Sequence, residues 1–189
     1  DSMPETADNV AEDWQVARAD QDAFAVRSQD RWAAAHTAGV FADEIAPVHI
    51  PQRKGDPLVV TDDEHPRPGT QADKLAKLRG INGQDKSVTA GNASGVNDGA
   101  AALLIASDTA AQAHGLTPIA RIVTTNAAGV APRVMGIGPV PASRKALNHA
   151  GLGIEQMDVI ELNEAFAAQG LATLRDLGVA DDDPRVNAQ

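Results

Sequence analysis

The feature that most constrains the fold is an alternation of apolar runs and helix-favouring runs in the last third of the chain. Apolar runs that are typical of strands occupy residues 119–125 and 158–162. Runs of helix formers follow at residues 143–150 and 165–177, and a glycine stands after each of them. A strand–helix–strand–helix order is the signature of a parallel or mixed sheet covered by helices. The sequence therefore predicts an α/β fold in this part.

The last of these alternations places a polar amide at the junction between strand and helix. Residues 158–169 begin as a short apolar run and change to small, helix-favouring residues after Asn163. Ligands of α/β proteins usually bind at the carboxyl end of a strand. Asn is also a good N-cap. From the local pattern alone, Asn163 either caps the helix or contacts a ligand, and both alternatives stay open.

The first part of the chain shows no such alternation. Residues 4–38 are predicted to be helical, in two runs, and Gly39 follows as a helix stop. Residues 45–50 predict a single strand, and prolines and glycines divide the following segment, up to Gly69, into short pieces. The change in pattern comes later, so we expect a domain boundary near residues 92–97.

A turn rich in Gly, Asn and Ser marks that boundary. It covers residues 89–99 and leads into an unbroken apolar run at residues 100–107. The run fits a buried parallel strand, although a helix is not excluded by its periodicity. A helix is predicted from Asp108 to His114, where Gly115 ends it. A Gly/Pro-rich loop is predicted at residues 129–139.

Composition removes several classes of function. The chain of 189 residues contains no Cys, so it holds no disulfide, no thiolate metal site and no thiol nucleophile of its own. A formal net charge of −10 argues against non-specific binding of nucleic acid and against an anionic membrane surface. No apolar run is long enough to cross a bilayer, and we expect no signal peptide and a cytoplasmic location. The first residue is Asp1 rather than Met, so we expect the true start to lie elsewhere.

Other motifs of site chemistry are weak or missing. None of the five His residues has metal-ligand spacing, so no metal site is predicted. The Gly136-x-Gly138 pair is followed by Pro139, which argues against a dinucleotide fingerprint. Ser94 either forms a turn or donates a hydrogen bond to a ligand. The basic residues between Arg53 and Lys86 either receive a phosphorylated ligand or form a mixed solvated surface.

Several segments, in this order and at this spacing, resemble the thiolases, the family of acyl-CoA acetyltransferases. They are residues 20–25 (DQDAFA), 53–56 (RKGD), 91–100 (GNASGVNDGA), 135–142 (MGIGPVPA) and 163–167 (NEAFA). The resemblance covers essentially the whole chain. Residues 159–171 and 181–187 are most similar to the thiolases of aromatic-compound breakdown that act on β-ketoadipyl-CoA (3-oxoadipyl-CoA).

The resemblance implies a partial thiolase-like fold of the α/β class. Residues 1–96 correspond to the mainly helical loop domain that covers CoA. Residues 97–117 correspond to the closing strand and helix of the N-terminal half, and residues 118–189 to the start of the C-terminal half. Each half of the family's fold is a βαβαβαββ unit, and a full subunit is much longer than this chain. The chain is therefore expected to be an internal piece of such a subunit.

The resemblance also implies roles for particular residues. Asn163 corresponds to an Asn that holds a water in an oxyanion hole for the substrate thioester oxygen, which makes it the expected catalytic residue of this chain. The expected CoA- and substrate-binding residues are Ser94, Ala165, Phe166, Met3, Arg67, Ala90, Val96 and Met135. One departure from the family pattern is Gly80-Ile81-Asn82, which stands where many members have Pro-x-Phe near the adenine.

The implied function is transfer of an acyl group between CoA and an enzyme cysteine, with cleavage of a 3-oxoacyl-CoA to acetyl-CoA and a shortened acyl-CoA. The family uses two Cys residues and a His in a Gly-His-Pro motif, and this chain contains none of these. We therefore expect the chain to be inactive alone. The alternatives are a non-catalytic module that binds CoA or acyl-CoA and a purely structural remnant. CoA and acyl-CoA are the expected partners, as substrates rather than cofactors, and the full-length protein is expected to form a homodimer or homotetramer.

Overall fold

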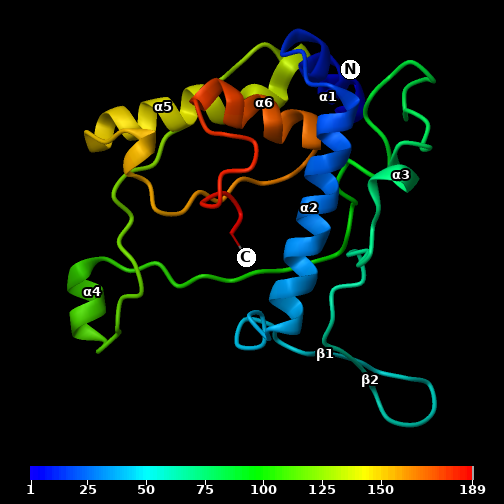
Figure 1. The fold of residues 1–189 in the computed structure, drawn as a ribbon. Helices are drawn as coiled ribbons and strands as arrows, with labels where there is room; N and C mark the ends of the chain where they lie inside the picture. Colours follow the sequence, from blue (N-terminus) through cyan, green and yellow to red (C-terminus); the bar gives the residue numbers. More distant parts are fainter. Residues whose placement is uncertain (189) are drawn as a thin grey trace.

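The computed structural model describes residues 1–188, and helices dominate it (Figure 1). The elements, in chain order, are α1 (Met3–Asp13), α2 (Arg18–Thr37), β1 (Val48–Ile50), β2 (Leu58–Val60), α3 (Ala72–Leu75), α4 (Asp108–Ala113), the 3₁₀ helix η1 (Pro132–Ile137), α5 (Pro139–Ala150), the 3₁₀ helix η2 (Ile154–Gln156) and α6 (Ala167–Leu177).

Helix α1 begins where its sequence predicts a helix start. Ser2 is the N-cap, and its side chain and that of Glu5 form a reciprocal capping box. Pro4 lies in the first turn, where its missing N–H costs no hydrogen bond. The chain then turns at Gln15, whose φ of 53° is left-handed, and α2 starts three residues later. The predicted helical segment is confirmed as two helices.

Helix α6 lies at the centre of the core. All eight residues from 167 to 174 are buried, and the helix packs against α1, α2, α5 and η1 (Figure 1). Gly170 permits the close approach of α2, because a Cβ at this position would lie 3.1 Å from the Phe24 ring. The core thus joins helices from the two ends of the chain.

Polar side chains on α6 add ties to the N-terminal helices. Arg175 donates to Asp20 of α2 at 2.7 Å and to Asp181 at 2.6 Å. These bonds, with Asp181 contributing most, raise the pKa of Arg175. The indole Nε1 of Trp14 donates to Asp176 at 3.1 Å. The C-terminal end of α6 is thereby tied to α1 and α2.

The predicted helices in the second half are confirmed, with two shifted starts. Helix α4 ends before Gly115 as predicted, and α6 begins at Ala167 rather than 165. Helix α5 begins at Pro139 rather than 143, because proline is well suited to the first turn of a helix. The loop predicted at residues 129–139 is wrong for residues 132–137, which form η1.

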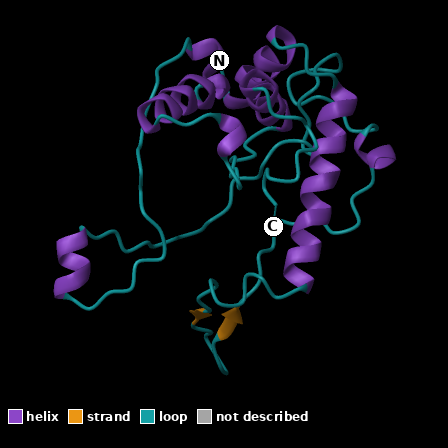
Figure 2. Cartoon of the chain, turned by 60° about the vertical axis from the view of Figure 1, so that its left-hand side comes forward, coloured by secondary structure: helices purple, strands orange, loops and turns teal. Residues whose placement is uncertain are grey.

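The strands predicted at residues 100–107, 119–125 and 158–162 are wrong for the described chain. These residues are extended but unpaired, except that Ile160 forms a single parallel bridge with Val186 (Figure 2). A strand needs a neighbour for its N–H and C=O groups, and residues 1–188 supply none to the first two segments. Without a neighbour, the apolar side chains of these segments lie at the surface: Leu103 is 88% exposed and Ile119 is fully exposed, at 102%.

The single strand predicted at residues 45–50 is confirmed as β1. It pairs with β2 in an antiparallel hairpin that extends away from the helices (Figure 1). Across residues 1–188, no helix combines the length and apolar character that crossing a bilayer requires.

Candidate functional site

A short backbone pairing brings two of the singled-out segments together. The N–H of Ser94 donates to the carbonyl of Ala165 at 2.9 Å, and the N–H of Ala167 donates to the carbonyl of Asn92 at 2.9 Å. Ala93 and Phe166 form the antiparallel bridge between these bonds. The Gly/Asn/Ser-rich turn therefore lies directly against the start of α6. Three of the predicted binding residues, Ser94, Ala165 and Phe166, share this place.

The buried side chain of Asn92 holds this turn in place. Its Oδ1 accepts from the N–H of Thr89 at 2.8 Å, and its Nδ2 donates to Asp22 of α2 at 3.0 Å and to the carbonyl of Ser87 at 3.1 Å. Asp22 is buried as well and accepts from Arg18 at 2.8 Å. The amide thus links the turn to the long helix of the N-terminal half.

A second buried carboxylate, Asp8 on α1, fixes the segment that leads to this turn. It accepts from the N–H of Val88 at 3.0 Å, from the N–H of Ser87 at 3.1 Å and from the side chain of Asn82 at 2.7 Å. Asn82, the departure from the family pattern, therefore has an internal role here. Segment 82–92 is anchored on both α1 and α2.

Asn163 lies on the connection before α6 and does not cap that helix. The N-cap is Phe166, three residues later. Asn163 is exposed, and among residues 1–188 its side chain makes no hydrogen bond. The capping alternative is therefore wrong, and the amide is free to bind a ligand.

The two neighbours of Asn163 are bonded to one side chain from the C-terminal segment. Asn187 Oδ1 accepts from the N–H of Leu162 at 2.8 Å, and Asn187 Nδ2 donates to the carbonyl of Leu162 at 2.9 Å. The same Nδ2 donates to Glu164 Oε1 at 2.7 Å. Asn187 has a left-handed φ of 45°, a conformation that Asn adopts more readily than most residues.

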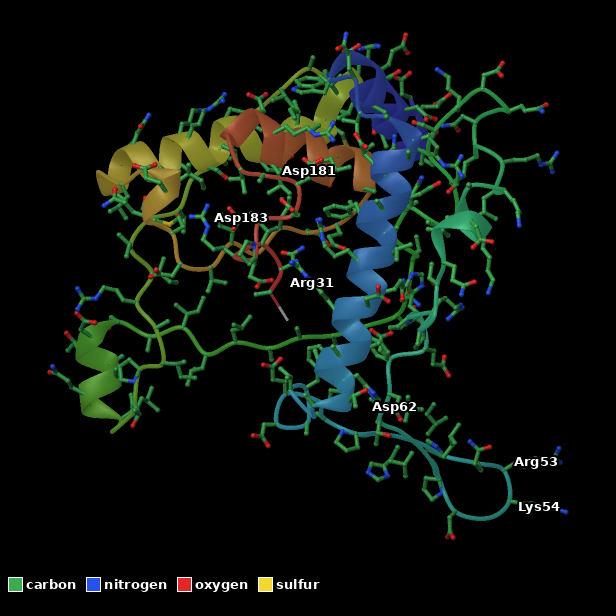
Figure 3. All side chains as sticks on the ribbon, in the orientation of Figure 1. Arg31, Arg53, Lys54, Asp62, Asp181 and Asp183 are labelled. Atoms are coloured by element: carbon green, nitrogen blue, oxygen red, sulfur yellow. The ribbon has the colours of Figure 1, made fainter. Side chains whose placement is uncertain are left out.

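The segment that carries Asn187 is itself anchored by ion pairs. Arg185 donates through its side chain and backbone to Asp183, which lowers the pKa of that carboxyl from 3.8 to about 2. Arg185 also donates to the carbonyl of Met157 at 2.9 Å. Arg31 of α2 reaches the same segment and donates to the carbonyls of Val186 and Asn187 (Figure 3).

Met3 and Met135 lie on neighbouring elements. Met3 is in the first turn of α1 and Met135 is in η1, and these two helices pack together. Arg133 of η1 is paired with Asp13 of α1. Each methionine is about half exposed, at 49% and 48%, so both side chains remain available at the surface.

The other predicted binding residues occupy the loop around the same turn. Ala90 and Val96 are exposed on either side of Ser94. Gly95 packs on the imidazole of His65, where a Cβ would lie 2.4 Å from a ring carbon. Arg67 follows His65 closely, and its Nη1 donates to the carbonyls of residues 64, 65 and 66. The structure therefore folds the guanidinium of Arg67 back onto its own loop.

The remaining basic residues of segment 53–86 do not gather at this turn. Arg53 and Lys54 are exposed at the tip of the β1–β2 hairpin (Figure 3). Lys77 pairs with Asp73 and Lys86 with Glu12. Within the part of the chain that the structure describes, no group of three His, Asp or Glu side chains could hold a metal ion.

A separate surface groove of about 470 Å³ runs along α2 and includes none of the predicted site residues. It is lined by Ala23, Val26, Arg27, Asp30, Arg31, Ala34 and Ala72. The groove is wide open to solvent. The site geometry described above, and not this groove, contains the amide and hydroxyl groups suited to a ligand.

The residues that hold the site segments in place by hydrogen bonds could not be recognised from the sequence. The sequence patterns indicate no role for Asp8, Asp22, Arg31 or Asn187. A buried carboxylate cannot be recognised from its own sequence neighbours. Asn187 gives only a weak signal, since an Asn in a loop is one of the few residues that tolerate a left-handed φ.

The side chains at this site can bind a ligand and polarise its carbonyl group through hydrogen bonds. An exposed amide at Asn163 and an exposed hydroxyl at Ser94 can donate hydrogen bonds to a carbonyl or an amide of a ligand. The chain has no thiol for covalent catalysis. Any covalent chemistry through a thiol would therefore need a nucleophile from outside these residues.

Comparison with known families gives two adjacent matches that together span nearly the whole chain. The model described as "Thiolase, N-terminal domain" matches residues 1–109, and the model described as "Thiolase, C-terminal domain" matches residues 116–189.

Curated relatives are similar along almost the whole chain. A "Beta-ketoadipyl-CoA thiolase" of Pseudomonas putida is 65% identical over 187 residues, which are 99% of this chain and 46% of that protein. The "3-oxoadipyl-CoA/3-oxo-5,6-dehydrosuberyl-CoA thiolase" of Escherichia coli (strain K12) is 58% identical over 99% of this chain and 47% of that protein. The chain thus spans about half the length of these relatives.

Solved structures agree with the fold as well. The Bacillus anthracis acetyl-CoA acetyltransferase superposes with a TM-score of 0.93 at 45% identity, over 98% of this chain and 46% of that one. Human mitochondrial 3-ketoacyl-CoA thiolase in complex with CoA gives a TM-score of 0.89 at 46% identity, over 98% and 45%. The prediction of a partial α/β fold of this type is confirmed.

Proposed function

The chain belongs to the thiolase family, and from this premise we propose that it is part of an acyltransferase that cleaves a 3-oxoacyl-CoA with free CoA. The products are acetyl-CoA and an acyl-CoA shortened by two carbons. The observation that carries the proposal is the pairing of Ser94 with Ala165, which aligns the two segments expected to contact the acyl-CoA. The substrate we propose is 3-oxoadipyl-CoA, because the relatives of highest identity given above carry that activity in their names.

In the proposed reaction, a cysteine thiolate from outside this chain attacks the 3-oxo carbon. The bond between carbons 2 and 3 breaks, and its electron pair moves into the thioester as an enolate whose charge lies on the thioester oxygen. Protonation of carbon 2 releases acetyl-CoA. The thiolate of a second CoA then takes the acyl group from the enzyme cysteine.

Asn163 is proposed to stabilise the enolate oxygen. Its amide is exposed, and within the described chain it has no competing hydrogen bond, so it can orient a water toward that oxygen. A preorganised donor of this kind contributes about 10²- to 10³-fold to kcat. Ser94 is proposed to bond the pantetheine arm, beside Ala165 and Phe166. Met3, Ala90, Val96 and Met135 are proposed to line the acyl-CoA pocket.

Arg67 is proposed to lie near the CoA nucleotide. Within residues 1–188, its own loop uses only Nη1, in bonds to carbonyls at 2.8–3.1 Å. The other two guanidinium nitrogens, Nε and Nη2, are left for a phosphate. The full-length protein is proposed to form a homodimer or homotetramer.

The test is thiolysis by the full-length protein that contains this chain. With 3-oxoadipyl-CoA and CoA, chromatography is expected to detect acetyl-CoA and succinyl-CoA in equal amounts. Asn163→Ala is expected to lower kcat by about 10²-fold or more, whereas Asn148→Ala on the exposed face of α5 leaves it unchanged. The 189-residue chain alone is expected to give no turnover. If the full-length protein forms neither product from any 3-oxoacyl-CoA, the proposal is wrong.

A second candidate is a non-catalytic module that binds CoA, which would need only exposed hydrogen-bonding groups such as those of Ser94 and Asn163. Calorimetric titration of the 189-residue chain with CoA distinguishes the two, together with the thiolysis assay. Saturable binding by a full-length protein that never turns over would support the module.

A further inference from the structure

The side chain of Asn187 replaces a strand neighbour at the backbone that carries Asn163. The parallel bridge between Ile160 and Val186 uses two backbone bonds of 2.9 Å, from Ile160 to Arg185 and from Asn187 to Ile160. One residue further along, the left-handed φ of Asn187 turns its backbone away. Its side-chain amide then continues the pairing and bonds both the N–H and the C=O of Leu162.

The third bond of Asn187 lies on the other side of Asn163. Nδ2 donates to the carboxylate of Glu164 at 2.7 Å. Leu162 and Glu164 are the two neighbours of Asn163, so one side chain restrains the residues on both sides of it. The exposed Asn163 amide itself is left free.

Asn187 is itself held in place by the core and by α2. Val186, beside Asn187, is 1% exposed and belongs to the core. Arg31 donates to the Asn187 carbonyl at 3.0 Å from the middle of α2 (Figure 3). Asn187 therefore connects the residues beside Asn163 to the packed helices.

We propose that Asn187 is a positioning residue for Asn163: it fixes the backbone of Leu162 and the carboxylate of Glu164, so that the Asn163 amide holds a water against the reacting thioester oxygen. This role rests on the proposed function. A displacement of about 1 Å at a catalytic group can cost about 10²-fold in rate. A restraint on both neighbours is therefore expected to act on kcat, and little on the binding of CoA.

Few residue types can make the contacts that Asn187 makes at position 187. Asn supplies an acceptor, two donor hydrogens and tolerance of a left-handed φ. Asp keeps the acceptor and the φ, but loses both donor bonds and places a second carboxylate against Glu164. Gly keeps the φ and loses all three side-chain bonds.

The experiment uses the full-length protein and the thiolysis assay. Asn187→Gly is expected to lower kcat by about 10- to 100-fold, with KM for CoA changed by less than about twofold. Asn187→Asp is expected to lower kcat at least as much, and adding Glu164→Gln should recover several-fold, because the neutral amide removes the repulsion and donates to the new carboxylate. Asn187→Asp also provides a folded variant if the glycine protein does not fold.

A double-mutant cycle separates positioning from general stability. In an Asn163→Ala background, Asn187→Gly is expected to change kcat by less than about twofold, because the group that it positions is already gone. A merely structural loss would lower kcat by the same factor in both backgrounds, and that result would overturn the proposal.

Amide hydrogen exchange gives a readout that needs no activity. The N–H of Leu162 is expected to exchange faster in Asn187→Gly, while that of Leu171 in the core stays protected. Unchanged exchange at Leu162 would overturn the restraint. If the wild type catalyses thiolysis and Asn187→Gly has the same kcat, the positioning role is overturned but the proposed function is not. Absence of thiolysis in the wild type overturns the proposed function and, with it, the catalytic meaning of Asn187.

Discussion

Asn92 donates its side-chain amide to the carboxylate of Asp22 at 3.0 Å, across 70 positions of sequence and between two buried side chains. The carbonyl of Asn92 also accepts a hydrogen bond from the N–H of Ala167, the first residue of α6. A single residue therefore connects α2, the turn that carries Ser94 and the start of the central helix. The site depends on this connection for its alignment.

Asn92→Ala is expected to destabilise the protein by about 2–3 kcal/mol. The substitution leaves the buried N–H of Thr89 without its acceptor and removes one donor from Asp22, and an unsatisfied buried polar group costs about 1–3 kcal/mol. Arg18 continues to neutralise Asp22, which limits the loss. Urea unfolding followed by circular dichroism measures the change.

Asn148→Ala is the matched control, because Asn148 is exposed on α5. Its free energy of unfolding is expected to stay within about 0.5 kcal/mol of the wild type. Equal effects of the two substitutions would contradict a structural role for the amide of Asn92.

Gly80→Ala is expected to destabilise the protein by about 1–3 kcal/mol through overpacking. A Cβ at this position would lie 2.4 Å from the carbonyl oxygen of Gly83 and 2.5 Å from that of Lys86, and backbone atoms cannot move aside as a side chain can. Gly99→Ala is the control, since a Cβ there meets nothing within 4 Å. Thermal melting of the two variants should separate them clearly, and similar melting temperatures would argue against the tight turn at Gly80.

Asp183→Asn is expected to lose stability in a pH-dependent way. The hydrogen bonds from Arg185 lower the pKa of Asp183 from 3.8 to about 2 in the folded protein. Its contribution is therefore complete above about pH 5, where the carboxylate is ionised in both states, and is lost as the pH falls from about 5 to about 1. The difference in free energy of unfolding between wild type and variant, from urea titrations at several pH values, should shrink over that range.

Asp182→Asn provides the control at the next position, where the side chain is exposed. Its difference from the wild type in the free energy of unfolding is expected to remain small. A difference for Asp183→Asn that is independent of pH would show that the pairing with Arg185 does not depress the pKa.

Leu104→Lys is expected to weaken self-association of the 189-residue chain. Leu103, Leu104 and Ile105 are 88%, 81% and 75% exposed on an extended, unpaired segment. Burying one Leu contributes about 1.5–3 kcal/mol, so its loss should weaken association about tenfold or more. Sedimentation velocity over a concentration series measures this, with Gln112→Lys on α4 as the control for added charge. A monomeric wild-type chain would refute the expectation.

Local signals predicted the helices well, because each depends on residues close in sequence. Gly115, Gly151 and Gly178 end α4, α5 and α6 in left-handed conformations, as the glycine pattern predicted. The start of α5 was missed, since Pro139 looked like part of a loop but is equally suited to a first helical turn.

Long-range pairing was the part that the sequence could not provide. The run at residues 100–107 has the composition of a buried strand, but its conformation depends on neighbours that residues 1–188 do not supply. Asn163 could be singled out from its place between a strand pattern and a helix pattern, whereas the residue that bonds its neighbours, Asn187, follows only from the tertiary structure. The role of each residue in binding stays a prediction until the variants are assayed.

The central position of α6 has a consequence for how the protein is made. During synthesis, α1 and α2 leave the ribosome well before residues 167–177. More than a hundred further residues must be added before Val10 and Phe24 can pack against α6. Domains generally fold as units as they emerge, and transiently exposed apolar surface invites aggregation. The nascent chain is therefore expected to remain a client of ribosome-associated chaperones until α6 has emerged.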